Sequence, residues 1–311
     1  MSEFHHVSVL LEECIQGLNI KPDGIYVDGT LGGAGHSSRI AAKLTTGRLV
    51  GIDRDPIALA AAKKRLEPFD ERVTLVHANY SQMDNALDEL GIDKVDGVLL
   101  DLGVSSPQLD DGERGFSYMV DAPLDMRMNH ADARDAHEIV NHWSYEDLKK
   151  ILYEYGEERY APQIAAAICR RREASPIETT LELVDVIRGA MPASALREKQ
   201  HPAKRSFQAI RIAVNDELNS LSEVMQIAIP RLKPGGRLAV ITFHSLEDRI
   251  VKNAMAEAAK GCTCPPNFPV CVCGKKPSVK LITRKPIVST DAELDTNPRA
   301  RSAKLRICEK L

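Results

Sequence analysis

Three acidic residues and a run of glycines carry the clearest chemical signal in this sequence. Asp28 follows a short apolar run and precedes four glycines within seven positions, Gly29 to Gly35. Asp53 and Asp101 each end another apolar run. Strand, carboxylate, glycine turn and helix is the order in which an α/β sheet builds a ligand crevice at the carboxyl end of its strands. We therefore expect the three carboxylates to lie at one edge of a sheet and to bind a ligand.

The glycine run differs from the dinucleotide fingerprint, since no G-x-G-x-x-G can be aligned with it. A pyrophosphate is an anion and favours bare amides at a helix N-terminus. Asp28 instead favours a ligand with positive charge, such as the ammonium and sulfonium groups of S-adenosylmethionine. Asp53 lies 25 residues beyond Asp28 and could bind both hydroxyls of a ribose. The alternative is a purely structural turn, in which glycine supplies backbone freedom.

Other residues at expected strand ends have two interpretations each. Tyr80 could stack on an adenine ring or fill the core. Asp55, which precedes Pro56, could cap a helix rather than bind a ligand. Asp101 ends the expected central strand, from which a side chain can reach both cofactor and substrate. A lone aspartate at a strand end is also a common turn former.

Strand and helix patterns alternate through the first hundred residues. Pro56 fits the first turn of its helix, where a missing N–H costs nothing. This succession of short βα units predicts a parallel, doubly wound sheet. The expected strands are residues 25–27, 48–52, 73–77 and 97–100, and the expected helices are 37–44, 56–66 and 83–90.

The alternation stops after Leu102. Residues 103–129 are rich in Gly, Ser, Pro and Asp, and they predict a long loop with a functional role. Helices are expected at 144–155, where Ser144 and Asp147 have capping spacing, and at 157–173 and 179–190. A further long amphipathic stretch carries on one face Phe207, Ile210, Val214, Leu218, Leu221 and Met225.

Strand patterns return at residues 237–243, 279–282 and 304–307, and a turn is expected at 233–236. The simplest organisation is one α/β domain interrupted by an all-helical insertion. Its parts would be residues 1–106, the insertion at 107–205 and residues 206–311. Because the insertion leaves from the carboxyl edge of the sheet, we expect it to form a wall of the substrate site.

The composition is that of a soluble globular protein, with 43% hydrophobic and 27% charged residues among 311. No signal-peptide pattern or membrane-length apolar run is found, so we expect a cytoplasmic protein without a membrane partner. Net charge is −3, yet residues 252–311 hold 12 Lys and Arg against five Asp and Glu. Together with basic clusters at 170–172 and 197–205, this permits either a polyanion-binding face or an ordinary solvated surface.

Four cysteines fall within twelve residues, namely Cys262, Cys264, Cys271 and Cys273. Four thiolates can hold zinc in a tetrahedral site. The C-x-C spacing differs from the usual C-x₂₋₄-C, and reduced cysteines in a cytosolic loop are the alternative. The seven cysteines of the chain do not form the pattern of a secreted disulfide framework.

Several segments resemble the bacterial MraW family, in the same order along the chain and from about residue 6 to residue 309. Members of that family use S-adenosylmethionine to methylate N4 of a cytidine in the decoding centre of 16S ribosomal RNA. The matching segments are 28–37 (DGTLGGAGHS), 52–56 (IDRDP), 101–110 (DLGVSSPQLD), 114–117 (RGFS), 124–128 (LDMRM), 155–159 (YGEER), 207–211 (FQAIR) and 243–249 (FHSLEDR).

The resemblance implies a class I (Rossmann-like) methyltransferase sheet with an inserted all-helical domain. S-adenosyl-L-methionine would be the cofactor, and no metal ion is expected. The partner would be 16S rRNA or the small ribosomal subunit, while a homodimer is left open. Together with Asp28, the residues expected to contact the cofactor are Ala34, Gly35, His36, Asp53 at the ribose, Tyr80 near the adenine, Asp101 and Gln108.

Methylation at N4 of cytosine requires assistance, because the lone pair of this amine is delocalised into the ring. The amine must be held in line with the methyl group, about 3–3.5 Å away. An acceptor must also take a hydrogen bond from the amine, or its proton. Asp101 or an oxygen of Ser105 or Ser106 could be that acceptor. No cysteine nucleophile is needed, unlike in methylation at C5, and the cysteines avoid the expected strand ends.

His244 follows the expected fifth strand and could face the substrate or bridge to the backbone. Ser245 and Asp248 have the spacing of a capping box, so a helix start is the structural alternative for this segment. We expect the catalytic set to contain His244 together with Asp101 and Ser105.

Three other functions fit the sequence less well. An N-methyltransferase acting on another nucleic acid, such as DNA, usually carries Asn/Asp/Ser-Pro-Pro-aromatic after the fourth strand, and residues 101–104 differ from it. A nicotinamide dehydrogenase would carry the dinucleotide fingerprint. A non-catalytic ribosome assembly factor could bind RNA through the basic region, but it would not need the cofactor residues.

Overall fold

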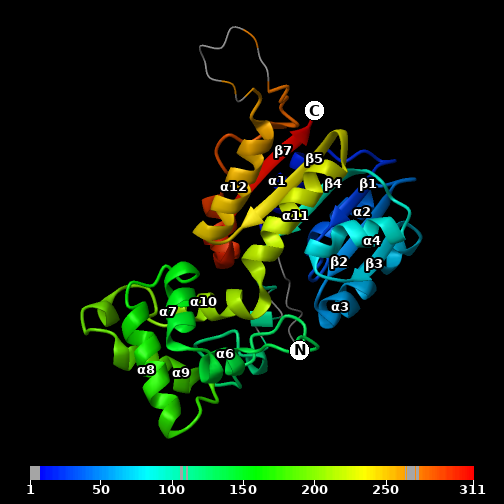
Figure 1. The fold of residues 1–311 in the computed structure, drawn as a ribbon. Coiled ribbons are helices and arrows are strands. Elements are labelled where there is room, and N and C mark those ends of the chain that lie inside the picture. The colour runs from blue at the N-terminus through cyan, green and yellow to red at the C-terminus, as the bar shows by residue number, and fades with distance from the viewer. Residues whose placement is uncertain (1–7, 106–107, 110, 263, 265–269, 271–272) are drawn as a thin grey trace. The chain divides into compact units, whose positions relative to one another are not determined.

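The computed structural model describes residues 8–105, 108–109, 111–262, 264, 270 and 273–311. The chain divides into two compact units (Figure 1). The sheet unit consists of Met1–Gly103 and Leu218–Leu311, and the helical unit is Val104–Glu217. The expected insertion at 107–205 lies within the helical unit, which begins three residues earlier and ends twelve residues later.

A seven-stranded sheet forms the centre of the described sheet unit. Strand order is β3-β2-β1-β4-β5-β7-β6, with β1 to β5 parallel and β7 antiparallel to both of its neighbours. This arrangement confirms the expected class I methyltransferase sheet. The strands are β1 Ile25–Asp28, β2 Arg48–Asp53, β3 Val73–His77, β4 Val95–Asp101, β5 Leu232–Thr242, β6 Val279–Leu281 and β7 Lys304–Lys310.

Both faces of the sheet are covered, because alternate strand residues point to opposite sides. Val98 and Leu100 of β4 belong to one core with α4, α11 and α12, whereas Leu99 between them belongs to another core with α1, α2 and α3. The helices of this unit are α1 Leu11–Leu18, α2 Gly35–Lys43, α3 Pro56–Leu66, α4 Met83–Glu89, α11 Glu217–Arg231, α12 Ser245–Ala259 and α13 Asp291–Thr296, with 3-10 turns η1 Glu67–Arg72, η2 Tyr80–Gln82 and η5 Pro298–Ser302.

The turn expected at residues 233–236 is wrong in form, because β5 begins at Leu232 and runs through it. Pairing passes from Val95–Leu232 to Gly97–Arg237, so β5 contains more residues than β4 across this interval. The surplus forms a bulge in which Gly235 has a φ of 78°. Glycine adopts this left-handed conformation at low cost, which is why the segment has the composition of a turn.

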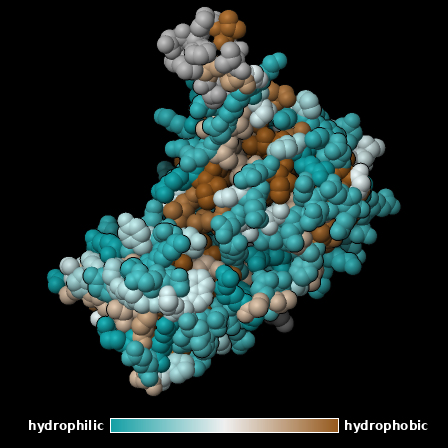
Figure 2. All heavy atoms as spheres, in the orientation of Figure 1, coloured by the Kyte–Doolittle hydropathy of each residue, from teal (hydrophilic) through white to brown (hydrophobic). Residues whose placement is uncertain are grey.

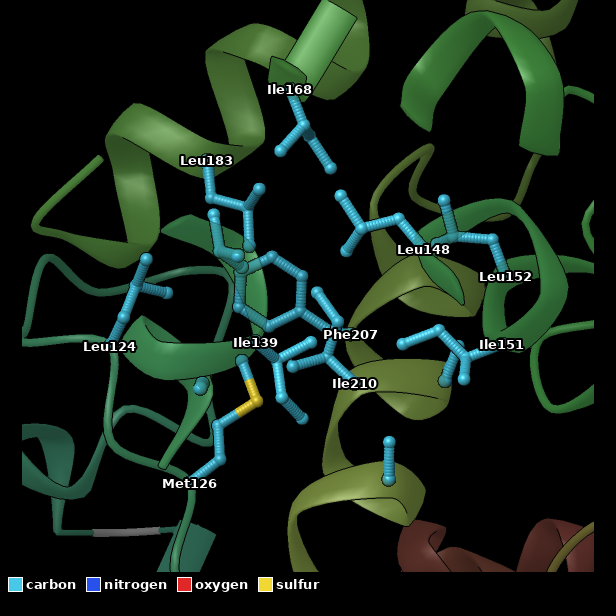
Figure 3. Packing of buried hydrophobic residues seen from close by; sticks show 14 of the residues in the cluster. Leu124, Met126, Ile139, Leu148, Ile151, Leu152, Ile168, Leu183, Phe207 and Ile210 are labelled. Carbon is cyan, nitrogen blue, oxygen red and sulfur yellow. The ribbon is translucent and has the colours of Figure 1, made fainter. Parts of the chain in front are cut away.

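The helical unit has its own apolar core, shown in Figure 3. Phe207 and Ile210 of α10 lie at its centre and meet side chains of α7 and α9, such as Ile151 and Leu183. The helices of this unit are α6 Ala136–His142, α7 Tyr145–Glu154, α8 Ala161–Ala174, α9 Thr180–Ala190 and α10 Lys204–Asn215, with 3-10 turns η3 Gly112–Arg114 and η4 Ala195–Arg197.

The long amphipathic stretch is two helices rather than one. Asp216 is left-handed, with a φ of 50°, and it ends α10 before α11 begins at Glu217. Phe207 belongs to the core of the helical unit, whereas Leu221 and Met225 belong to a core of the sheet unit. Periodicity alone did not reveal the break, because the apolar spacing continues across one residue of different backbone conformation.

The predicted helix at 157–173 begins later than expected, since α8 starts at Ala161. Glu157 has a φ of 48°, which lies outside the helical region. Ser144 caps α7 as expected, because its side chain accepts a hydrogen bond from the N–H of Asp147. Sequence pattern therefore located these helices well and their first residues less well.

The expected long loop after β4 is held by buried polar groups. The guanidinium of Arg114 donates to the carbonyl oxygens of Arg127 and Met128, 2.9 Å from each. Gly115 has a φ of 71°, and a Cβ there would lie 2.3 Å from the carbonyl oxygen of Pro123. The segments 114–117 and 124–128 thus contact each other and fix the conformation of the loop within the helical unit.

Hydrophilic side chains cover most of the face shown in Figure 2, with apolar patches among them. Isolated exposed apolar residues are normal on soluble proteins. Among the helices that the structure describes, none has the length and apolar character needed to cross a membrane.

Asn215 provides a test of this scaffold, because its buried amide joins α10 to the loop. It donates to the carbonyl of Met126 at 2.7 Å and accepts from the N–H of Met128 at 2.9 Å. Asn215→Leu leaves both backbone groups unpaired, at about 1–3 kcal/mol each, so the free energy of unfolding should fall by roughly 2–6 kcal/mol. Urea unfolding followed by the fluorescence of Trp143, the single tryptophan of the chain, measures this change.

Gln163→Leu on the exposed face of α8 is the matched control, and it should leave the unfolding midpoint nearly unchanged. Equal midpoints for Asn215→Leu and the wild type would contradict the role given to Asn215.

Candidate functional site

Asp28, at the end of β1, organises the glycine loop from inside. It is 1% exposed. Its Oδ1 accepts from the N–H of Thr30 at 3.1 Å, and its Oδ2 accepts from the hydroxyl of Ser37 at 2.7 Å. Since Ser37 lies in the first turn of α2, one carboxylate holds both ends of the loop between strand and helix.

Backbone conformation in the loop explains its composition only in part. Gly32 has a φ of 48°, and Ala34, which is fully buried, has a φ of 58° at the start of α2. A Cβ added at Gly35 would lie 1.8 Å from Oγ of Ser8, whereas one added at Gly33 would meet no described atom within 4 Å. Gly33 is therefore not required by packing within the described residues, and its bare backbone suits close approach of a ligand.

Asp53, at the end of β2, supports the same loop from the neighbouring strand. Its Oδ2 accepts from the N–H of Gly32 at 2.7 Å, and its Oδ1 accepts from the N–H of Asp55 at 2.9 Å. Asp55 caps α3 through the N–H of Ile57, as the alternative interpretation for that residue expected. A carboxylate fixed in this way keeps lone pairs that can accept from ribose hydroxyls.

Asp101, at the end of β4, is the third of the strand-end carboxylates. Its Oδ1 is buried, and among the described residues it has no hydrogen-bond partner. The side chain as a whole is 24% exposed, and its Oδ2 lies 3.6 Å from Nδ1 of His36. Its backbone N–H donates to Oγ1 of Thr30 at 2.5 Å. A buried acceptor without a protein partner can be satisfied by a bound molecule or by water.

His36 is held beside Asp101 by the chain that precedes α1. Its Nε2 lies 3.0 Å from the carbonyl oxygen of Val9, which can only accept, so Nε2 carries the proton. In the neutral ring Nδ1 is then an acceptor that faces Oδ2 of Asp101. Two facing acceptors are compatible when one of them gains a proton.

Burial and mutual repulsion raise the pKa values of the carboxyl groups. Burial raises the pKa of Asp28 to about 6, against hydrogen bonds from Ser37 and Thr30 that lower it. Burial also raises the pKa of Asp101 well above its usual range, and the charges of Asp28 and Glu247 raise it further. Burial raises the pKa of Asp53 as well. A cation at this edge would relieve the repulsion.

Tyr80 begins η2, directly after the Asn79 that caps it. Its Cβ lies 3.2 Å from where a Cβ on Gly29 would be, so it borders the glycine loop. The ring is partly buried against the core of the sheet unit. Tyr80 therefore packs on the core, as one interpretation expected, and its stacking on an adenine stays a prediction.

Ser105 and Gln108 belong to the helical unit. The N–H of Ser105 donates to Oε1 of Gln108 at 2.9 Å, and Gln108 is 5% exposed. Ser106 lies outside the described residues. The structure brings together Asp28, Asp53, His36 and Asp101 within the sheet unit, and the roles expected of Ser105 and Gln108 stay predictions.

His244 is a helix cap, with a capping box one residue earlier than expected. It is the N-cap of α12, and its ring accepts from the N–H of Glu247 while the Glu247 carboxylate accepts from the N–H groups of Phe243 and His244. Asp248, expected to share a box with Ser245, instead binds Arg306 at 2.6 Å. A histidine as cap is uncommon, so the Ser245 pattern misled the sequence analysis.

Three residues that shape the site escaped the sequence analysis. The hydroxyl of Thr30 accepts a hydrogen bond from the backbone N–H of Asp101, and the hydroxyl of Ser37 donates one to the carboxylate of Asp28. Glu247, 2% exposed, lies close enough to raise the pKa of Asp101. The spacing of Glu247 from His244 was the signal available for a capping box, although serine at 245 is the more usual cap.

The arrangement suits a ligand that has hydroxyls and positive charge. Asp53 can accept from a ribose, the loop at Gly33 leaves room for a ligand, and the acidic groups at Asp28 and Asp101 favour a cation. The orphaned Oδ1 of Asp101 can then accept from a polar N–H of a second molecule.

Comparison with known proteins agrees with this geometry. The model of the MraW methylase family matches residues 3–311. Ribosomal RNA small subunit methyltransferase H of Brevibacillus brevis is 58% identical over 309 residues, with 99% of this chain and 98% of that protein covered. The protein of the same name from Heliobacterium mobile is 57% identical over 311 residues, which covers 99% of this chain and 100% of that protein. The chain belongs to the MraW methylase family.

Proposed function

We propose that this protein transfers a methyl group from S-adenosylmethionine to the exocyclic N4 of one cytidine in the decoding centre of 16S rRNA. The family is one of S-adenosylmethionine-dependent methyltransferases. Its relatives are named for the RNA of the small ribosomal subunit. The choice of N4 is supported by the resemblance of the motifs and, in this structure, by the unpaired Oδ1 of Asp101.

Residues of the sheet unit suit this cofactor. Asp53 would accept from its ribose hydroxyls, and Asp28 and Asp101 would favour its positive charges. Ala34, Gly35 and His36 would line the bound cofactor, and Tyr80 borders the same glycine loop. When bound, S-adenosylmethionine supplies an electrophilic methyl group on a sulfonium. The protein must supply orientation, exclusion of water and a place for the proton.

Asp101 is suited to assist an amine nucleophile. A hydrogen bond from N4–H to Oδ1 of Asp101 restores electron density to the nitrogen and fixes its direction. The carboxylate acts in this way only when ionised, and burial raises its pKa. A cation beside it lowers that pKa, so cofactor binding prepares the acceptor. The same oxygen can take the proton once the new N–C bond has formed.

Cys14 bears on the choice between N4 and C5 of cytosine. Its thiol is fully buried, and burial together with the charges of Asp101 and nearby acids raises its pKa well above the usual value. Methylation at C5 would need a thiolate that attacks the ring. A thiol kept protonated near the carboxylates is a poor nucleophile, which favours the exocyclic amine as the acceptor.

We assign recognition of the RNA to the helical unit. A shallow, open hollow there is lined by Arg159, His201 and Arg205 among others. His201 stacks on Tyr118 with ring centroids 4.5 Å apart. Arginines bind phosphates and flat rings stack on unpaired bases. Of the basic cluster at 170–172, two arginines bind carbonyl groups within the unit, and in the hollow Arg159 pairs with Glu198.

Nucleoside mass spectrometry tests the proposed reaction. Small ribosomal subunits that lack the modification are incubated with the protein and methyl-labelled S-adenosylmethionine, and the digested RNA is analysed. We expect label in N4-methylcytidine at a single position of 16S rRNA. Label in 5-methylcytidine alone, or none in RNA, would overturn the proposal.

Asp101→Asn tests the acceptor. Loss of the carboxylate should lower the single-turnover rate at saturating cofactor by about 10²–10⁴-fold, the usual contribution of a positioned base. In the wild type the rate should rise up to about tenfold per pH unit until the pKa of Asp101 in the cofactor complex is passed, because only the ionised form accepts. The variant should lose this dependence.

Asp23→Asn, at an exposed acid of the same unit, is the control and should retain the wild-type profile. A variant at Asp101 with full turnover and normal cofactor affinity would exclude this residue as the acceptor.

Proton release on cofactor binding tests the electrostatics. Because a cation favours ionised carboxylates, binding should lower the pKa of Asp28 from about 6, and affinity should rise with pH and level off above that value. Calorimetry in two buffers of different ionisation enthalpy measures the protons released. S-adenosylhomocysteine, which lacks the sulfonium charge, should release fewer. Equal release for both ligands would contradict a role for the sulfonium.

A further inference from the structure

The cysteines after α12 are the one sequence motif that methyl transfer does not use. The Sγ atoms of Cys262 and Cys273 lie 3.7 Å apart. The sulfur atoms of Cys262, Cys264 and Cys273 all lie within 4.8 Å of one another. None of these three forms a disulfide with a described residue. Cys271, the fourth member of the sequence motif, lies outside the described residues.

We propose that Cys262, Cys264 and Cys273 bind a zinc ion. A Zn–S bond is about 2.3 Å long, which places two sulfurs of a tetrahedral site about 3.8 Å apart. The Sγ atoms of Cys262 and Cys273 lie 3.7 Å apart, far beyond the roughly 2.05 Å of a disulfide. Three thiolates leave one position of a tetrahedral ion for a further ligand.

The surrounding chain is arranged as zinc–thiolate sites require. The N–H of Cys264 donates to Sγ of Cys262 at 3.4 Å, a bond that stabilises the charge of a metal-bound sulfur. Gly274 follows Cys273 with a φ of 62°, which permits the sharp turn that aims the sulfur back. Lys275 and Lys276 come next in the sequence, and the ammonium group of Lys275 pairs with Glu257. Each thiol that binds releases its proton to solvent.

Hydrogen bonds near the cluster show what the ion would stabilise. Both the N–H and the hydroxyl of Ser278 donate to the carbonyl oxygen of Ala258, at 2.8 and 3.1 Å. The chain that leaves α12 therefore returns beside its last turn before it enters β6. Cys262 follows Ala258 by four residues and Cys273 precedes Ser278 by five, so the two cysteines lie on the two segments that this contact joins. Zinc bound by these cysteines would link the two segments and so reduce the conformational entropy that the segment between them has in the unfolded state.

Position in the fold makes the ion structural rather than catalytic. α12 begins beside His244 at the carboxyl ends of the strands, and it has 15 residues. At 1.5 Å per residue, its last turn lies about 22 Å further along the axis. The cluster follows that last turn, so it lies far from Asp101 and the glycine loop. Removal of zinc should thus leave cofactor affinity unchanged.

Metal analysis of the full chain, purified without chelator, tests the site. We expect one zinc per chain in the wild type and loss of most of it in each of Cys262→Ser, Cys264→Ser and Cys273→Ser. Cys169→Ser in α8 is the matched control and should retain the ion. Replacement by Co²⁺ should give the sulfur-to-cobalt charge-transfer bands of a thiolate site, a readout that needs no variant.

Tryptic cleavage gives a second readout for the wild type. After chelation, cleavage at Lys260 and Lys275 should become faster, while S-adenosylmethionine binds with the same affinity. A wild-type protein without zinc, or zinc retained in all three serine variants, would overturn the proposal. Mass spectrometry of the freshly reduced and refolded protein gives a further check. A mass lower by two hydrogens, which indicates a disulfide, would also overturn the proposal.

Discussion

Burial of carboxylates at one edge of a parallel sheet is the constraint on which this structure depends. Asp28 lies on the strand between those of Asp53 and Asp101, and each of the three has a raised pKa because water is excluded. Unpaired charges of this kind would destabilise the fold by several kcal/mol. The glycine loop offsets the cost for Asp28 and Asp53 with backbone N–H groups and a hydroxyl. Of the three, Asp101 has an oxygen that no described residue pairs, and this is where a ligand can supply a hydrogen bond.

The sequence predicted the structure well at positions where a residue type has a strong local preference. Strand-ending aspartates, glycines and the proline of α3 all occur where the pattern predicted them. It was a poor guide wherever a residue acts through a partner far along the chain. The break at Asp216 separates two cores that share one apolar period, and the cap at His244 depends on Glu247. Neither relationship is visible in local spacing, because tertiary packing selects between local alternatives of similar energy.

The segments that resemble the MraW family serve two different purposes in the fold. Those in the sheet unit carry the acidic groups and the loop around which chemistry can occur. Those in the helical unit, such as the ones that contain Arg114 and Asp125, bind backbone carbonyls and neighbouring charges within that unit. A motif in this protein is therefore not by itself a sign of ligand contact. Buried polar side chains require partners, which makes their surroundings as specific as a binding site.

The insertion of the helical unit between β4 and α11 has a consequence for the order of folding. β4 and β5 pair side by side, yet β4 ends at Asp101 and β5 begins at Leu232. During synthesis the helical unit, rich in local contacts, emerges complete before β5 exists. Until then β4 keeps an open edge of the kind to which another chain can add. The helical unit can thus complete its own core while the sheet still lacks β5, β6 and β7.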